Sequence, residues 1–304
     1  MYVIGKFCDA IDSRQPIYGL NTTPIYSNTG FIILAYALEN ITGKPYKDML
    51  QRSVIDPLHL YSTSVSKPDD SRARIWKQET PRRKQSPPLP IYPLTIPSVG
   101  GIYSSANDIS TLGRSILNST LLPINTTRAW LKPTAFTSSL YGAVGRPWEI
   151  YRAILAAESA NRIVDIFTKA GDLGLYHSIL ALMPDYNVSY TVLAGGQESH
   201  SWVDGLMADI VLPALEIVAQ EETDAIYAGL YETTNSLNSS TTFTTDAAKP
   251  GLGIQNWINN GTNMRIALSK QFKFPANTSS IRVYPTNLQR STENGTGIII
   301  LITI

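Results

Sequence analysis

Three apolar runs in the middle of the chain, separated by turn-forming residues, constrain the fold more than any other feature. Residues 163–169, 175–183 and 188–195 are rich in aliphatic, β-branched and aromatic side chains, a composition that favours strands. Gly, Asp, Pro and Asn occur at 170–174 and 184–187, where we expect turns. The sequence therefore predicts three consecutive strands with short connections, and hence a sheet.

Apolar residues at helical spacing flank these strands, so the main domain is expected to be α/β. The most apolar pattern, residues 29–42, predicts a mostly buried helix that Ser27 or Asn28 caps and Gly43 ends. Residues 62–98, rich in proline and basic side chains, predict a long solvated loop. Further helices are predicted at 45–54, 105–117 and 201–220.

The character of the sequence changes after about Asp224, where short β-like runs alternate with Asn, Gly, Thr and Ser. We therefore place a domain boundary near residue 222, between a main domain at 1–222 and a small all-β domain at 223–304. The final residues, GIIILITI, are strand-like and lack a polar stop, so we expect the second domain to be incomplete.

Composition and charge exclude several classes of protein. With 304 residues, 43 % of them apolar, the chain can bury a core and is not disordered. A net charge of +1 argues against a nucleic-acid-binding surface. The sequence has no run of 18 apolar residues, so we predict no membrane span.

The chain is unusually rich in Asn-x-Ser/Thr sequons, which accept N-glycans on secreted proteins. The nine sequons begin at Asn21, Asn40, Asn118, Asn125, Asn187, Asn238, Asn260, Asn277 and Asn294. Passive enrichment from many Ser and Thr residues is the alternative. We expect an extracellular full-length protein that could carry N-glycans, although the first residues do not form a signal peptide. Cys8 is the single cysteine, so no internal disulfide is expected.

Several well-defined catalytic and metal-binding motifs are absent from the sequence. It has no Gly-x-Ser-x-Gly elbow, no Walker A loop, no His-Glu-x-x-His and no Cys-x-x-Cys. The three histidines do not have the spacing of metal ligands. We therefore predict neither a metal site nor a cofactor.

Two short motifs could form a proton-transfer pair. Tyr26 and Asn28 lie directly before the apolar helix, and Lys169 ends a predicted strand beside Gly171. A tyrosine at a helix start near an ammonium can exchange a proton with a serine nucleophile. Each motif alone is a weak signal, because such short patterns arise by chance.

Longer stretches around these motifs carry a resemblance. In chain order they are PIYSNTGFIILAYALENITGKPYKDMLQRSVIDPLHLYSTS, PSVGGIYSSANDISTLGRSIL and DIFTKAGDLGLYHSILALMPDYNVSYTVLAGG. They resemble the serine β-lactamase-like family, in its class C and penicillin-binding-protein branch, over about residues 17–290. With the sequons and the β-rich tail, they are similar to secreted fungal members that carry an extra C-terminal β domain. The resemblance implies an α/β, β-lactamase-like fold, with helices flanking an antiparallel sheet.

The resemblance also implies roles for individual residues. Tyr26 matches the family's general base, Asn28 the asparagine that holds substrate and lysine, and Lys169 the lysine of Lys-Thr-Gly. We expect Tyr26, Asn28 and Lys169 to line one cleft, with the Tyr26 hydroxyl within direct or one-water reach of the Lys169 ammonium. The substrate-binding positions match Ala170, Gly171 and Asp172. Ala170 replaces the usual hydroxyl residue, which favours ester or amide substrates over β-lactams. The backbone N–H of Asp172 matches an oxyanion-hole donor.

The family's nucleophile, the serine of Ser-x-x-Lys, has no counterpart ahead of Tyr26. Ser13 is the one serine there, and position 16 is Pro16 rather than lysine. The single Ser-x-x-Lys match, from Ser64 to Lys67, follows the tyrosine motif and is interpreted as coincidence. We therefore expect no nucleophile in this chain, and we interpret it as N-terminally truncated. The missing segment would also hold a signal peptide, the first sheet strands and a partner for Cys8.

Two functional hypotheses follow. The first is a β-lactamase-related serine hydrolase of esterase or amidase type, or a transesterase, of which this chain holds part of the site. Its partner would be a small-molecule ester, amide or lactam. The second is a non-catalytic truncated product or pseudoenzyme with a vestigial binding cleft. Either hypothesis predicts that these 304 residues alone are inactive. With the sheet reduced to the three later strands, we also expect one of them to present an unpaired edge.

Overall fold

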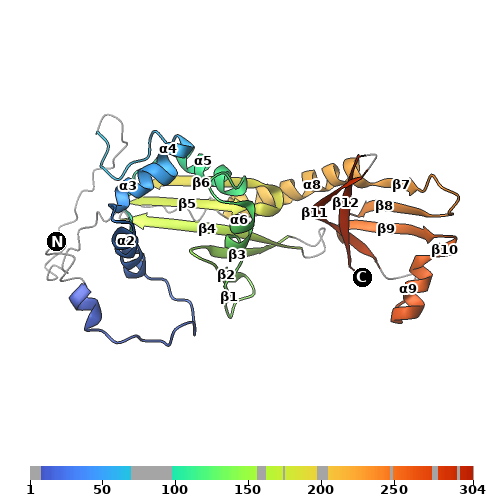
Figure 1. Cartoon of the computed structure of the whole chain (residues 1–304), viewed down its shortest axis with the longest axis horizontal. Helices are drawn as coiled ribbons and strands as arrows, with labels where there is room; N and C mark the ends of the chain where they lie inside the picture. Colours follow the sequence, from blue (N-terminus) through green and yellow to red (C-terminus); the bar gives the residue numbers. More distant parts are fainter. Residues whose placement is uncertain are drawn as a thin grey trace. The chain divides into compact units, whose positions relative to one another are not determined.

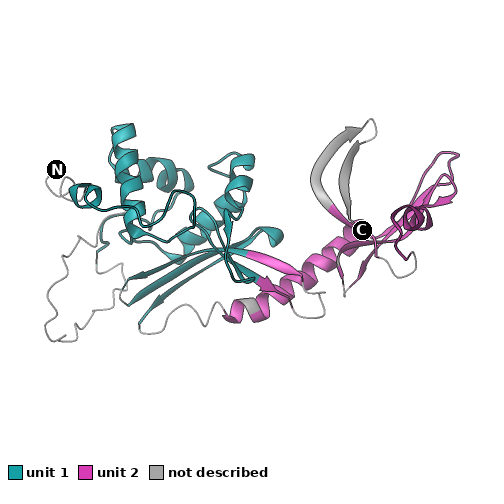
Figure 2. Cartoon of the chain, turned by 90° about the horizontal axis from the view of Figure 1, so that it is seen from below, with its two compact units in different colours: residues 1–152, 166–200 teal, residues 153–165, 201–304 magenta. Residues whose placement is uncertain are grey.

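The computed structural model describes residues 8–69, 98–155, 162–173, 175–196, 205–246, 249–275, 280–292 and 295–303. The chain divides into two compact units, which Figure 2 shows in different colours. Unit 1 comprises residues 1–152 and 166–200, and unit 2 comprises residues 153–165 and 201–304. Each unit is described by itself.

The first sheet is a six-stranded meander in the order β1-β2-β3-β4-β5-β6, so each strand pairs with its neighbour in sequence (Figure 1). Antiparallel registers join β1 to β2, β2 to β3, β4 to β5 and β5 to β6. The strands are β1 (Ala135–Phe136), β2 (Gly142–Val144), β3 (Glu149–Ile154), β4 (Ile163–Leu173), β5 (Tyr176–Met183) and β6 (Val188–Gly195).

The three strands predicted from the sequence are confirmed as β4, β5 and β6. β4 continues to Leu173, so the first turn begins later than predicted. The expectation that only these strands are available is wrong, because β1, β2 and β3 extend the sheet beyond β4. Among the described strands, β6 pairs on one side only and forms an edge, as expected.

The ends of the first long helix of unit 1 are as predicted. α2 (Asn28–Thr42) is capped by the Ser27 hydroxyl, which accepts from the Gly30 N–H at 3.1 Å, and it ends at Gly43 with φ of 65°. The prediction that this helix is mostly buried is wrong. Ile32 and Ala35 are its buried residues. Several large apolar side chains are exposed, namely Ile33, Leu34, Leu38 and Ile41.

The pattern predicted as a helix at 45–54 forms three short consecutive helical segments. They are α3 (Tyr46–Leu50), a π-helical turn (Gln51–Ile55) and α4 (Asp56–Leu58). Ile55, Leu58 and Leu60 form a small core with Leu112 of α5 (Ala106–Leu117), whose N-cap is Ser105. The Asp108 carboxylate accepts from the Ser62 N–H and the Thr63 hydroxyl at 2.8 and 2.7 Å. These bonds join the start of α5 to the preceding chain.

The main core of unit 1 lies between one face of the first sheet and two helices. It contains Ala143, Trp148, Ile150, Phe167 and Leu182, packed against residues of α5 and of α6 (Ile124–Trp130). Gly113 allows α5 to approach the sheet closely, because a Cβ there would lie 2.8 Å from the Ser189 hydroxyl. This packing holds β4 and β5 rigidly in place.

Unit 2 contains the second sheet, in the order β12-β11-β9-β8-β7, with β10 paired to β9. The strands are β7 (Gly229–Glu232), β8 (Ser240–Asp246), β9 (Lys249–Asn259), β10 (Thr262–Asn263), β11 (Arg282–Thr292) and β12 (Gly295–Thr303). α8 (Leu212–Tyr227) follows a π-helical turn (Met207–Val211). The helix predicted at 201–220 therefore runs seven residues further, to 227, and residue 222 lies within α8. Residues 201–204 lie outside the described residues.

The C-terminal region is not purely β, contrary to the sequence expectation. α9 (Met264–Phe272) begins at Asn263, whose side chain accepts from the Ile266 N–H at 3.3 Å. The core of this region contains Leu252, Ile254, Ile281 and Val283. A second sheet with its own core therefore follows the first one in the chain.

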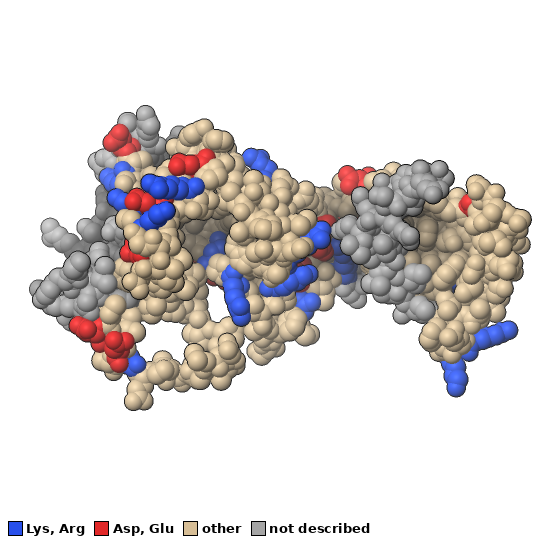
Figure 3. Space-filling model, viewed as in Figure 1, with Lys and Arg blue, Asp and Glu red and all other residues tan. Residues whose placement is uncertain are grey.

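Part of the predicted loop at 62–98 lies outside the described residues, as do the sequons at Asn277 and Asn294. In the part of the chain that the structure describes, no helix is long and apolar enough to cross a membrane. On the face shown in Figure 3, basic and acidic side chains of the described residues are interspersed.

Candidate active site

The candidate site lies on β4 and on the residues directly before α2. Alternation along a strand places Lys169 and Gly171 on one face of β4 and Ala170 and Asp172 on the other. Phe167 shares the face of Lys169 and is packed in the core of unit 1. The lysine is therefore held on a strand whose neighbouring positions are fixed by packing.

Lys169 has two hydrogen-bond partners and one ring contact. Its Nζ donates to the Glu149 Oε1 at 2.8 Å and to the Ala170 carbonyl at 3.1 Å. The same nitrogen lies 4.9 Å from the ring centroid of Tyr26. The side chains of Lys169 and Glu149 are 26 % and 35 % exposed, so both remain within reach of solvent.

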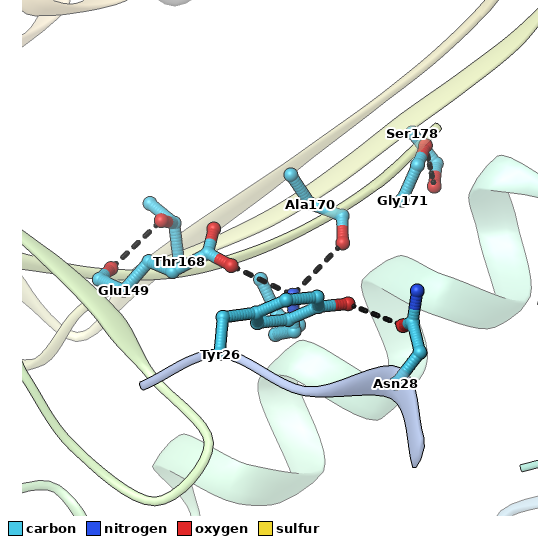
Figure 4. A network of polar contacts seen from close by, with 8 residues as sticks. Tyr26, Asn28, Glu149, Thr168, Ala170, Gly171 and Ser178 are labelled. Carbon is cyan, nitrogen blue, oxygen red and sulfur yellow. Dashed lines mark hydrogen bonds and ion pairs between the residues drawn. The ribbon is translucent and has the colours of Figure 1, made fainter. Parts of the chain in front are cut away.

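Tyr26 and Asn28 approach this lysine from the start of α2. The Tyr26 hydroxyl donates to the Asn28 Oδ1 at 2.8 Å, as Figure 4 shows. The capping bond of Ser27 lies between these two positions and fixes the backbone where the helix begins. Tyr26 itself is 63 % exposed, so its ring covers the ammonium while the side chain stays accessible.

The structure thus brings Tyr26, Asn28 and Lys169 together although 143 positions separate the tyrosine from the lysine in the sequence. The ammonium lies over the face of the ring and the hydroxyl is bonded to Asn28, so the expected approach of the ammonium to the hydroxyl stays a prediction. A cation in this position is attracted by the negative π-face. We call Tyr26, Asn28, Glu149, Lys169 and Ala170 the Lys169 cluster.

The three candidate substrate-binding residues occupy different surroundings. Ala170 directs its carbonyl toward the Lys169 ammonium and its methyl group away from it (Figure 4). Gly171 lies opposite Ser178 of β5, whose hydroxyl donates to the Gly171 carbonyl at 3.2 Å. The side chain of Asp172 is bonded to the His177 Nδ1 at 2.6 Å and does not join the Lys169 cluster.

Glu149 is the residue of this site that the sequence analysis missed. It is the first residue of β3, and the buried Thr168 hydroxyl donates to its carbonyl at 2.8 Å. This bond places Glu149 beside Thr168 and Lys169 in the sheet. A lone acidic residue at the start of an apolar strand, in WEIYRAI, was the available signal. It could not be used without knowing that β3 pairs with β4.

The structure places the only Ser-x-x-Lys match away from any helix. Ser64 forms an isolated antiparallel bridge with Tyr103, and its hydroxyl donates to the Ser66 carbonyl at 2.6 Å. Serine and lysine can share a face at this spacing only on a helix. The geometry therefore supports the interpretation of this match as coincidence. Among the described residues, no group of three or more His, Cys, Asp or Glu side chains could hold a metal ion.

Comparison with protein families gives two matches along the chain. The model of the beta-lactamase family matches residues 2–210. A second family model, described as a beta-lactamase-like C-terminal domain, matches residues 219–303. Together they account for most of the chain.

Curated fungal relatives extend the comparison. The chain is 32 % identical over 308 residues to a protein named "Beta-lactamase-like protein" from Arthroderma benhamiae, covering 94 % of this chain and 50 % of the relative. It is 31 % identical over 257 residues to a protein from a Phoma species whose name begins "Probable hydrolase", covering 80 % of this chain and 40 % of the relative. The chain thus spans about half the length, or less, of these relatives.

Solved structures share the fold at low identity. The octameric penicillin-binding protein homologue from Pyrococcus abyssi has a TM-score of 0.52 at 14 % identity, over 93 % of this chain and 62 % of that one. A beta-lactamase/D-alanine carboxypeptidase from Pseudomonas syringae has a TM-score of 0.50 at 17 % identity, over 64 % and 60 % of the two chains. These likenesses confirm the β-lactamase-like α/β fold expected from the sequence.

Proposed function

The chain belongs to the beta-lactamase family of hydrolases, and from this premise we propose that it forms part of a serine hydrolase of the esterase or amidase type that acts through an acyl-enzyme. The observation that carries the proposal is the convergence of Tyr26, Asn28 and Lys169 from distant parts of the sequence. These residues would contribute the proton-transfer half of the site.

The reaction would proceed in two steps, acylation of the serine and hydrolysis of the acyl-enzyme. A serine Oγ attacks the substrate carbonyl carbon, and its proton passes to the Tyr26 oxygen in its deprotonated form. The C–O or C–N bond to the leaving group then breaks, and the Tyr26 hydroxyl returns the proton to the leaving oxygen or nitrogen. Water later hydrolyses the acyl-serine ester by the same proton route.

The nucleophile in this proposal comes from protein outside these 304 residues. Support comes from the relatives, whose length is about twice the matched part, and from Ser64, which lies in a bridge rather than on a helix. The backbone N–H of Asp172 would serve as one oxyanion donor. The substrate would be a small ester or amide, since Ala170 lacks the hydroxyl that meets a β-lactam carboxylate in the resembling family.

A non-catalytic product with a vestigial binding site is the second candidate. It is favoured by the same observation on Ser64, because the one Ser-x-x-Lys match in the sequence does not lie on a helix. In this candidate the Lys169 cluster would survive as a binding surface without turnover. The two candidates differ in whether a serine becomes covalently labelled in the full-length protein.

We also propose that the full-length protein is extracellular and glycosylated. All seven sequon asparagines within the described residues are exposed, which supports this proposal. They are Asn21, Asn40, Asn118, Asn125, Asn187, Asn238 and Asn260. Treatment of the secreted natural protein with an N-glycosidase, followed by peptide mass analysis, should show a mass gain of deamidation at several of these asparagines. Unmodified asparagine at every one of them would contradict the proposal.

Covalent labelling and ester hydrolysis test the proposed function. A fluorophosphonate probe should leave the 304-residue chain unlabelled and should label one serine in the full-length protein, established from its transcript. In that protein, Tyr26→Phe should lower kcat/KM for p-nitrophenyl acetate by about 10²–10⁴-fold, because proton transfer is lost. Tyr18→Phe is the matched control, since Tyr18 is an exposed tyrosine outside the cluster. An unlabelled full-length protein would establish the non-catalytic candidate instead.

A further inference from the structure

We propose that Glu149 makes the Lys169 cluster discriminate against carboxylate-bearing substrates, so that the group contacting β4 must be uncharged. This inference deepens the proposed function and rests on it, because a bound compound is a substrate only if the full-length protein is a hydrolase. The observation behind it is the set of partners that the Lys169 ammonium has in the structure. These partners are defined whether or not the protein is a catalyst.

A lysine ammonium has three N–H donors and no acceptor. In this structure one donor is used by the Glu149 carboxylate and one by the Ala170 carbonyl. The face of the Tyr26 ring lies on a further side of the nitrogen, 4.9 Å from its centroid. Two of the three donors are thus in use, and an incoming carboxylate would meet only the third, beside the Tyr26 ring and close to the Glu149 carboxylate.

Charge gives a second and independent reason. Glu149 places a negative carboxylate 2.8 Å from the ammonium, so the pair is neutral as seen by a ligand. A carboxylate ligand would come close to both groups and would be repelled by one as it was attracted by the other. A neutral carbonyl or ester oxygen meets no such repulsion. The site therefore favours uncharged acyl compounds over their anionic counterparts.

Two features of the backbone hold Glu149 in this position. The Thr168 hydroxyl is bonded to the Glu149 carbonyl at 2.8 Å, and Thr168 is 2 % exposed. Trp148, directly before Glu149, is packed in the core of unit 1. The carboxylate thus extends from a fixed strand, and rearrangement to release the ammonium would need a change in its own side-chain torsions.

Ala170 adds to the same preference. Its methyl group offers no hydrogen-bond donor, so a carboxylate at β4 gains no hydroxyl contact in return for displacing Glu149. Glu149 and Ala170 both act on the charged end of a substrate, and neither acts on the reacting carbonyl group. The substrate class that fits is an ester, lactone or amide without a free carboxylate near β4.

Anion binding to the isolated chain tests this inference directly. The probes are sodium benzoate and benzamide, which have similar shapes and differ in charge, and the readout is the amide chemical shifts of Ala170 and Gly171. Benzoate should cause no saturable shift in the wild-type chain. Glu149→Gln should bind benzoate at least about 10-fold more tightly than wild type, because one charged acceptor is removed from the ammonium. Benzamide should respond equally to both chains.

Three further variants complete the experiment. Asp185→Asn is the matched control, since it removes an exposed carboxylate from the turn between β5 and β6, outside the Lys169 cluster, and should not create benzoate binding. Lys169→Met combined with Glu149→Gln should abolish the gained binding. Glu149→Asp keeps the charge but withdraws it by one methylene, and its benzoate affinity should lie between those of wild type and Glu149→Gln. This conservative variant remains informative if the glutamine variant fails to fold.

Saturable benzoate binding by the wild-type chain, equal to that of Glu149→Gln, would overturn the proposal. Equal gains in Asp185→Asn and Glu149→Gln would also overturn it, since net charge alone would then explain the effect. Absence of any gain in both Glu149 variants would do the same. None of these readouts needs a nucleophile, so failure of serine labelling and failure of this inference are separate results.

Discussion

Each of the two sheets holds a cation, and the two cations differ in their exposure and in their partners. In the first sheet, Lys169 is 26 % exposed, is bonded to the side chain of Glu149 and to the carbonyl of Ala170, and contacts the ring of Tyr26. In the second sheet, the Arg282 side chain is 11 % exposed and donates to the carbonyls of Lys249 and Gly251. Asp246 lies further from the guanidinium, at 3.9 Å.

The difference indicates what each cation can do. Main-chain carbonyls cannot move away from Arg282 unless the strands move, so this cation joins β9 to β11 and cannot exchange partners. Side-chain partners can rotate away from Lys169, so its bonds can change while the sheet stays intact. Burial lowers the pKa of the Arg282 guanidinium, and the nearby Asp246 opposes that shift. We infer that Arg282 is structural and that Lys169 is available for ligand chemistry.

The largest expected effect is on stability when Arg282 is removed. Arg282→Met should destabilise the second sheet by about 2–5 kcal/mol, because the carbonyls of Lys249 and Gly251 lose their donor. Hydrogen exchange of β8 and β9 in increasing urea measures this. Lys270→Met is the control, because it removes an exposed positive charge from α9, and it should change the exchange rates little. Equal hydrogen exchange in both variants would show that Arg282 does not stabilise the second sheet.

The next effect concerns the space around the arginine. Gly253→Ala should cost about 1–3 kcal/mol, because its Cβ would lie 2.6 Å from the Arg282 Nη1 and overpack the site. Gly205→Ala is the matched control in unit 2, since a Cβ at Gly205 meets nothing within 4 Å. Thermal unfolding of the two variants should separate them clearly. A Gly253 variant as stable as the Gly205 variant would show that the guanidinium can shift freely.

A smaller effect is expected beside Lys169. Gly171→Ala should cost about 1 kcal/mol, because the new Cβ would lie 2.9 Å from the Ser178 hydroxyl, which can rotate away. Adding Ser178→Ala should restore most of the loss, as urea unfolding of the single and double variants would show. Gly142→Ala, with its nearest contact at 3.4 Å, is the control in the same sheet. Failure of the second substitution to restore stability would indicate backbone strain instead.

The smallest effect concerns the ion pair itself. Glu149→Gln should change the free energy of unfolding by no more than about 1 kcal/mol, because both side chains of the pair are partly exposed. A double-mutant cycle with Lys169→Met in urea would measure the coupling. A coupling free energy as large as the stability lost in Arg282→Met would show that Lys169 is as structural as Arg282.

Local signals account for the parts of the fold that were predicted correctly. The strands β4, β5 and β6 alternate with short turns, and Ser27, Ser105 and Gly43 are helix caps whose bonds involve residues only a few positions away. α9 was missed because its nine residues lie between strand-like runs and show little apolar periodicity. β1 and β2, with two and three residues, are too short for a pattern to appear.

Features that depend on tertiary context could not be predicted in this way. The apolar pattern of α2 suggested burial, yet Leu34 is 59 % and Ile41 79 % exposed in the described structure. For the site, the family resemblance supplied Tyr26, Asn28 and Lys169, which do lie together. Glu149 required the pairing of β3 with β4, which no local pattern reveals. The roles of these residues, and the domain boundary near 222, stay predictions.

The strand order of the first sheet has a consequence for how the chain folds during synthesis. Each strand from β1 to β6 pairs with the strand that leaves the ribosome directly before or after it. Every pairing therefore closes a short loop, and the entropic cost of bringing the strands together stays low. The sheet can grow one hairpin at a time as translation proceeds, with Lys169 and Glu149 meeting as soon as β4 has paired with β3.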